Sequence, residues 1–136
     1  MPGLKDIPGG FKQAAYFSGH ATAGTAIEHG LFRAPFRCTV TAVTFMTAST
    51  ITGANTNYCT LNVRNRTTGA GSVVIATLAF TSGVDTVAQT PKTITLSSTA
   101  ADLILAEDDV ITAEKAVAGT GLAMPAGLVA VYFKAS

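Results

Sequence analysis

Charged residues are scarce in this chain, and their scarcity limits what the protein can attract by electrostatics. Lys, Arg, Asp and Glu make up 12% of the 136 residues, whereas a soluble domain usually carries about a quarter. The formal net charge is +1, so the protein lacks the strong field that gathers nucleic acid or an anionic membrane. We therefore expect neither nucleic acid nor a membrane as a partner. Low charge also suits a surface that neighbouring proteins cover.

Long apolar runs and tryptophan are missing as well. No stretch approaches the roughly 20 apolar residues that span a bilayer. Met1–Asp6 lacks the basic segment and apolar block of a secretion signal, which predicts synthesis in a cytoplasm. Aromatic residues are 7% of the chain with no Trp. This weakens a sugar-binding interpretation, because sugar sites on β-sandwiches generally stack exposed rings against the sugar.

Side chains that catalyse reactions or hold metals are few and scattered. The only histidines, His20 and His29, have no cluster of Cys or carboxylates beside them, so we expect solvated or hydrogen-bonded imidazoles. Glu107-Asp108-Asp109 is predicted to be a solvated turn, since adjacent strand residues point to alternate sides. Gly119-Thr120-Gly121 is not a phosphate-binding loop, because neither a following Lys nor a predicted helix is present. We expect no enzyme activity, no metal and no cofactor.

Strands dominate what the sequence does contain. Tyr58–Asn65 alternates apolar and polar side chains cleanly, which is typical of a strand with one dry and one wet face. Cys38–Met46 also alternates, but its apolar phase slips, and a β-bulge near Ala42 would absorb that slip. We predict that the two segments form one β-hairpin. Thr50–Asn57, too long for a tight turn, would be its presented loop.

The state of the two cysteines follows from this hairpin. Cys38 begins one arm and Cys59 begins the other, so an antiparallel pair would hold them at opposite ends, too far apart to bridge. Cysteine is often a small core residue. The sequence therefore predicts two free, buried thiols and no disulfide.

Further short strands follow, with turn signals every ten residues or so. Ser72–Thr81 is apolar on both faces, so it either lies centrally or meets a second subunit. Ser98–Ala106 is either a brief helix or a loop and strand, and Val110–Lys115 and Leu128–Lys134 are strands. About seven or eight strands predict an all-β fold, a single antiparallel β-sandwich or jelly-roll-like domain over residues 18–136.

Residues 1–17 are predicted to be an extended N-terminal arm. The first ten hold two Pro and three Gly and show no periodic apolar face. Phe11, Tyr16 and Phe17 then carry more aromatic surface than a free tail needs. Two alternatives stay open for this aromatic stretch: an edge strand packed on its own core, or an arm that docks onto a partner subunit.

Three stretches carry a resemblance to a known family. They are Phe32-Arg33-Ala34-Pro35-Phe36 before a Thr/Val strand, the loop Ile51–Asn57, and Gly119–Gly127. Together they resemble the capsid decoration (head cement) proteins of tailed bacteriophages, over roughly residues 21–133. Where such sequences often have Gly-Asp before the penultimate strand, this chain has Asp108-Asp109.

The resemblance implies a structural virion protein without catalysis. It would bind the major capsid protein on the outer surface of the capsid, commonly as a homotrimer at three-fold positions, and stabilise the head lattice after synthesis in the host cytoplasm. Candidate capsid or subunit contacts are Phe11, Tyr16, Phe17, Arg33, Arg37, Asn55 and Asn57.

Other interpretations stay open beside the resemblance. From the residues alone, Arg33 with Arg37 and Arg64 with Arg66 are expected to be solvated strand-edge charges. A carbohydrate- or receptor-binding module of a phage tail or fibre would need a glycan site with exposed aromatic rings. A small enzyme on a jelly-roll scaffold would need a His/carboxylate metal cluster, for which the sequence offers least.

Overall fold

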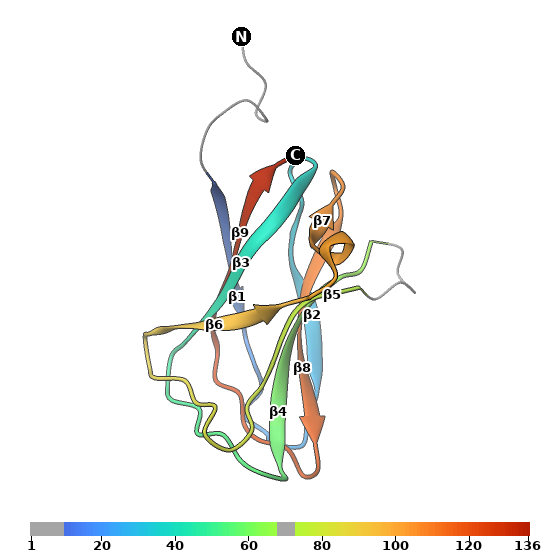
Figure 1. Ribbon diagram of the computed structural model, residues 1–136. Coiled ribbons are helices and arrows are strands. Elements are labelled where there is room, and N and C mark those ends of the chain that lie inside the picture. Colours follow the sequence, from blue (N-terminus) through green and yellow to red (C-terminus); the bar gives the residue numbers. More distant parts are fainter. Residues whose placement is uncertain (1–9, 68–72) are drawn as a thin grey trace.

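The computed structural model describes residues 10–67 and 73–136, and the chain there is almost entirely antiparallel β structure (Figure 1). Residues 1–9, most of the predicted arm, lie outside the described part. The elements are β1 (Phe11–Phe17), β2 (Ile27–Arg33), β3 (Cys38–Thr47), β4 (Tyr58–Asn65), β5 (Val73–Ala79), β6 (Pro91–Leu96), the 3-10 helix η2 (Ala100–Leu103), β7 (Ile104–Leu105), β8 (Val110–Ala118) and β9 (Gly127–Ala135).

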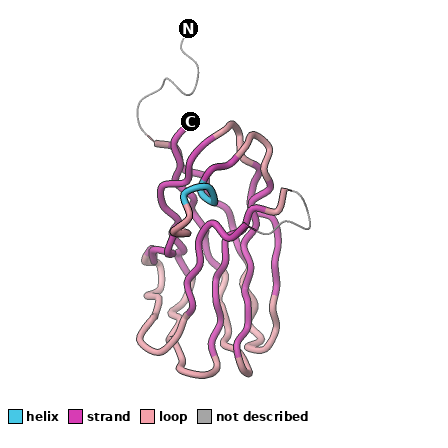
Figure 2. The backbone as a smooth tube through the Cα atoms, turned by 45° about the vertical axis from the view of Figure 1, so that its right-hand side comes forward, coloured by secondary structure: helices cyan, strands magenta, loops and turns pink. Residues whose placement is uncertain are grey.

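The strands form one continuous path of neighbours in the order β1-β9-β3-β6-β5-β4-β8-β2, with β7 pairing beside it on β3. The path folds over at β6. Pro91–Ile94 pairs with β3, whereas Thr95 and Leu96 pair with β5. In Figure 1, β6 crosses between a layer of β1, β9 and β3 and a layer of β5, β4, β8 and β2. Loops gather at the two ends of these layers, as Figure 2 shows.

The two edge strands of the path approach each other on the opposite side of the molecule. The Ser18 backbone N–H donates to His29 Nε2 at 3.4 Å, and the rings of Phe17 and His29 lie 4.8 Å apart. The sheet is thus nearly closed into a barrel. The all-β, antiparallel part of our prediction is confirmed, and the jelly-roll or sandwich assignment stays a prediction. Within residues 10–67 and 73–136, no helix is long and apolar enough to cross a membrane.

The predicted hairpin is wrong, although both of its arms are strands. β3 pairs with β9, β6 and β7, whereas β4 pairs with β5 and β8. The chain between them crosses from one layer to the other instead of turning back. Alternation identifies a strand and its buried face, but the partner strand is chosen by packing over long sequence distances. The predicted bulge is confirmed, because the register against β9 shifts between Val40 and Ala42.

The crossover before β4 is attached to the loop that precedes β6, so it is not a freely presented loop. The Ile51 N–H donates to Thr86 Oγ1 at 2.8 Å, and Thr47 Oγ1 lies 3.0 Å from the same hydroxyl. The Gly53 N–H donates to Asp85 Oδ1 at 2.7 Å. The Gly53 backbone also presses against the Thr81 carbonyl oxygen, leaving no room for a Cβ.

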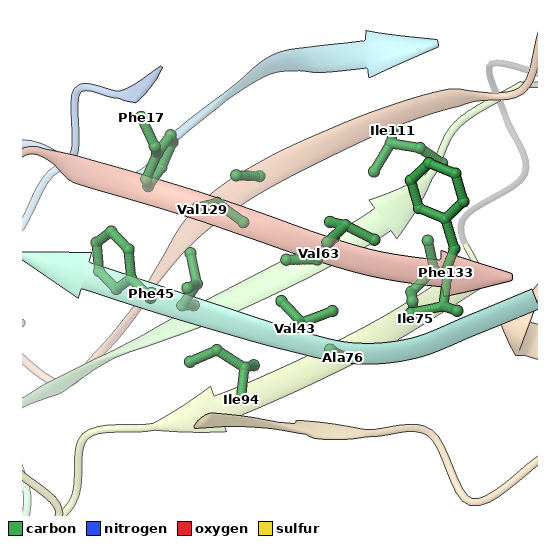
Figure 3. Packing of buried hydrophobic residues seen from close by; sticks show 14 of the residues in the cluster. Phe17, Val43, Phe45, Val63, Ile75, Ala76, Ile94, Ile111, Val129 and Phe133 are labelled. Atoms are coloured by element: carbon green, nitrogen blue, oxygen red, sulfur yellow. The ribbon is translucent and has the colours of Figure 1, made fainter. Parts of the chain in front are cut away.

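The core lies between the two layers (Figure 3). It is built from alternate residues of the long strands, as the sequence pattern predicts. It includes Phe17, Val43, Phe45, Val129, Val131 and Phe133 from one layer and Leu61, Val63, Ile75 and Ile111 from the other.

Both cysteines are buried and free, so the thiol prediction is confirmed. Its geometric reason fails, however, because Cys38 and Cys59 do not belong to one hairpin. Burial, and secondarily the charge of Asp109, raises the pKa of the Cys38 thiol to about 11.

The strand order shows which structure three segments with open alternatives adopt within the subunit. β5 lies between β4 and β6, so the apolar stretch Ser72–Thr81 is central within its described residues. Phe11–Phe17 is an edge strand, which pairs with β9 along its whole length. Ser98–Ala106 contains both a short helix, η2, and a short strand, β7.

Candidate interaction surface

On the outer face of the β5–β4–β8–β2 layer, arginine and glutamate side chains form ion pairs with one another. Arg66 donates from Nε and Nη2 to the two carboxylate oxygens of Glu28, both at 2.8 Å. Arg64 Nε donates to Glu114 Oε1 at 3.0 Å. The hydrogen bonds from Arg66, and then from Thr112, hold the pKa of Glu28 below its ordinary value despite partial burial. The expectation that Arg64 and Arg66 are solvated charges is therefore wrong.

The acidic turn before β8 is only partly solvated. Asp109 is buried, at 8% exposure, and its carboxylate accepts hydrogen bonds from Asn65 Nδ2, Thr67 Oγ1 and the Ala106 N–H at 2.7–2.9 Å. Burial alone would raise the pKa of Asp109, but these three donors lower it overall. The prediction of a solvated turn fails at Asp109, which anchors the turn between β7 and β8.

The described residues contain no group of three or more His, Cys, Asp or Glu side chains that could hold a metal ion. Both histidines are hydrogen-bonded, as expected. His20 Nδ1 accepts from the Thr22 N–H at 3.1 Å, and His29 Nε2 lies 3.2 Å from the Ser18 hydroxyl. His20 Nδ1 and His29 Nε2 are thus engaged in hydrogen bonds within the subunit.

The outer face of the β1–β9–β3 layer is different, because its centre is apolar and no other strand or helix of residues 10–67 and 73–136 covers it. Register places Tyr16, Leu128 and Met46 side by side across the three strands. Tyr16 is 64% exposed and Leu128 41%, which is high for large apolar side chains. We call this surface the β1–β9–β3 face; its residues are Tyr16, Leu128, Met46, Ala14, Ala130, Thr44, Lys12, Tyr132 and Lys134.

Small side chains leave the middle of the β1–β9–β3 face hollowed. Ala14, Ala130 and Thr44 form the row next to Tyr16, Leu128 and Met46. Two shallow depressions of about 190 and 160 Å³ lie over these rows and share Met46 and Leu128. Neither is an enclosed cleft, so the surface suits an apolar contact with another protein better than a small substrate.

The seven residues predicted as contacts do not form one cluster. Phe11, Arg33 and Arg37 lie at the end of the layers where β3 and β8 begin, whereas Tyr16, Phe17, Asn55 and Asn57 lie toward the other end.

The three aromatic candidates differ in what they expose. Phe11 is half-buried, with its ring centroid 5.2 Å from that of Phe36 and 6.0 Å from that of Phe133. Phe17 is fully buried in the core. Only Tyr16 presents most of its ring on the surface.

The polar candidates also differ in what engages them. Asn57 Oδ1 accepts the Thr120 N–H at 2.9 Å, so this side chain joins two loops. Arg33 is exposed and loosely paired with Asp108, at 3.8 Å between Nη2 and Oδ1. Arg37 and Asn55 are exposed.

Sequence reasoning missed the residues of β9 and β3 that flank Tyr16. The signal was available in the last strand, where Leu128, Ala130 and Tyr132 alternate with the buried Val129, Val131 and Phe133. Apolar residues on both parities mark a strand with two covered faces. Ser72–Thr81 shows the same pattern, but in β9 the outer side chain of Leu128 stays exposed.

No model of a known protein family matches the chain, and no curated protein matches it. Among solved structures, a chain of the cyanophage Pam1 capsid asymmetric unit is similar, with a TM-score of 0.50 and 25% sequence identity. The match covers 100% of this chain and 91% of that one. The likeness thus extends over the whole fold described above.

Proposed function

We propose that this chain is a structural protein of a phage virion, which binds the outer surface of the capsid as a decoration or cement protein and catalyses no reaction. The observation that carries the proposal is the full-length likeness to a chain of the cyanophage Pam1 capsid asymmetric unit. An uncovered apolar sheet face and a low charge content support it, since both suit a protein that neighbours cover.

Its partners would be the major capsid protein and further copies of this chain, most simply as a homotrimer. The central position of β5 weakens one argument for self-association, because both edges of β5 are paired and Ile75 is buried within the subunit. The argument that remains is the low charge content of the chain, which suits a surface that neighbouring copies cover. A homotrimer has the symmetry of a three-fold position in a capsid lattice, so one trimer would fit one such position.

Two measurements test the proposal. Purified protein is mixed with shells assembled from the major capsid protein of the same phage, then pelleted and imaged by negative stain. Saturable co-sedimentation with added density on the outside of the shells is expected. Light scattering of the free protein at high micromolar concentration should give three times the chain mass. Protein that stays in the supernatant at every ratio would refute capsid binding, and a monomer both free and shell-bound would refute the trimer.

A further inference from the structure

We infer that the β1–β9–β3 face is the capsid-binding surface and that it fits an apolar patch bordered by carboxylates; this rests on the proposed capsid attachment. Large apolar side chains at this exposure are costly unless a partner covers them. Tyr16 and Leu128 are adjacent by register and are among the most exposed large apolar residues described. The two depressions beside them are open receptacles for apolar side chains of a partner.

The charges on this face are all of one sign. Lys12 and Lys134 stand on the outward parity of β1 and β9, at the end away from Tyr16. Lys12 Nζ lies 5.8 Å from the centroid of the Tyr132 ring. No residue that lines either depression is acidic. Among residues 10–67 and 73–136, ion pairs form elsewhere and leave both ammonium groups without a carboxylate.

The other layer differs in that its cationic side chains are paired within the subunit. There, Arg64 and Arg66 are neutralised within the subunit by Glu114 and Glu28. On the β1–β9–β3 face no carboxylate of residues 10–67 and 73–136 pairs with the lysines, which leaves them available to carboxylates of a partner. An apolar centre with one cationic end therefore matches a surface with an apolar centre and one acidic end.

A second copy of this chain fits the face less well. If the face lay on the symmetry axis of a dimer or a trimer, the lysines of the subunits would share one interface without acidic partners. Like charges held close in an interface oppose association. We therefore assign the face to the capsid protein.

The test compares shell binding of the wild type with four variants at low and high salt. Leu128→Asn removes an apolar contact, and Val73→Asn is its control, because Val73 is 40% exposed but lies on β5 in the other layer. Lys12→Glu reverses a charge on the face. The double variant Ser98→Glu with Ala101→Glu, which changes the net charge by the same amount at exposed residues away from the face, controls for net charge. Circular dichroism and thermal melts confirm that every variant folds.

Leu128→Asn and Lys12→Glu should each weaken shell binding by about tenfold or more, while the two controls stay within about twofold. Wild-type binding should weaken as salt rises, and Lys12→Glu should lose part of that dependence. Failure of the wild type to bind shells would overturn the proposed function and this inference together. Shell binding by the wild type with no loss in Leu128→Asn and Lys12→Glu would overturn the inference alone. A Leu128→Asn variant that loses self-association and keeps shell affinity would assign the face to a second copy instead, which also overturns it.

Discussion

The ammonium of Lys115 lies 2.8 Å from the carbonyl oxygen of Thr22, inside the subunit. The same Nζ donates to the carbonyls of Ala23 at 3.2 Å and His20 at 3.3 Å. Lys115 is fully buried on β8, and its desolvation lowers the pKa of this ammonium. One cation therefore holds the connection between β1 and β2 against the edge of the sheet.

Lys115→Met should destabilise the fold by about 1–3 kcal/mol, because the Ala23 carbonyl loses its donor. Chemical denaturation measures the loss, and hydrogen exchange should speed up first in residues 18–26. Lys134→Met, at an exposed position of β9, is the matched control and should leave stability within about 0.5 kcal/mol. Equal stability of the two variants would mean that the carbonyls find other partners.

Stability should fall in acid because of the Glu28–Arg66 pair. The folded-state pKa of Glu28 lies below the ordinary 4.5, so the carboxylate stabilises the fold above that value. The contribution is lost as pH falls through the folded pKa. Melting curves from pH 7 to pH 2 should show a steeper fall for the wild type than for Glu28→Gln, which should have the lower Tm at pH 7. Glu107→Gln, at an exposed position of the turn before β8, is the control and should melt like the wild type at every pH. A Glu28→Gln profile identical to that of the wild type would contradict the role of the Glu28–Arg66 pair.

The two thiols should be unreactive in the folded protein. With a pKa of about 11, roughly a thousandth of Cys38 is thiolate at pH 8. Burial of both sulfur atoms slows reagent access further. Thiol titration should find almost no fast-reacting sulfhydryl in native protein and two per chain after unfolding without reductant. A chain mass lower by two protons, with no thiols after unfolding, would instead indicate a disulfide.

The sequence predicts the strands far better than it predicts their neighbours. Alternation located β4 and β9 and identified their buried faces, and the phase slip located the bulge near Ala42, because these features depend on local geometry. The pairing of β3 with β9 joins residues about 90 positions apart, and no local pattern contains that information. The hairpin prediction failed for this reason.

The candidate surface was predictable only in part. Tyr16 was named from its aromatic surface, but Phe17, one residue away, points into the core by simple strand parity. Arg64 and Arg66 looked solvated because their partners, Glu114 and Glu28, come from strands distant in the chain. An apolar face becomes visible only when neighbouring strands are known, since Leu128 and Met46 are brought together by the β3–β9 register.

The last prediction concerns the N-terminal arm in the proposed capsid attachment. β1 begins at Phe11, which stacks on Phe133, and ends at Phe17 in the core. Deleting residues 1–10 therefore leaves every core contact of β1 in place, and the Tm should stay within a few °C. Deleting residues 1–17 removes Phe17 and the partner strand of β9, so that variant should lose on the order of 3–5 kcal/mol or fail to fold.

The binding of the truncated protein to shells should show how much residues 1–10 contribute to capsid attachment. The first ten residues are rich in Gly and Pro, and ordering them costs on the order of 1 kcal/mol each in backbone entropy. We expect that cost to be met only where a lattice adds contacts, so the protein without residues 1–10 should elute from shells at lower salt than the full chain. Retention equal to the full chain would make residues 1–10 a passive tail. Shell binding would then depend on the β1–β9–β3 face alone, and Leu128→Asn should weaken the binding of the truncated protein and of the full chain by the same factor.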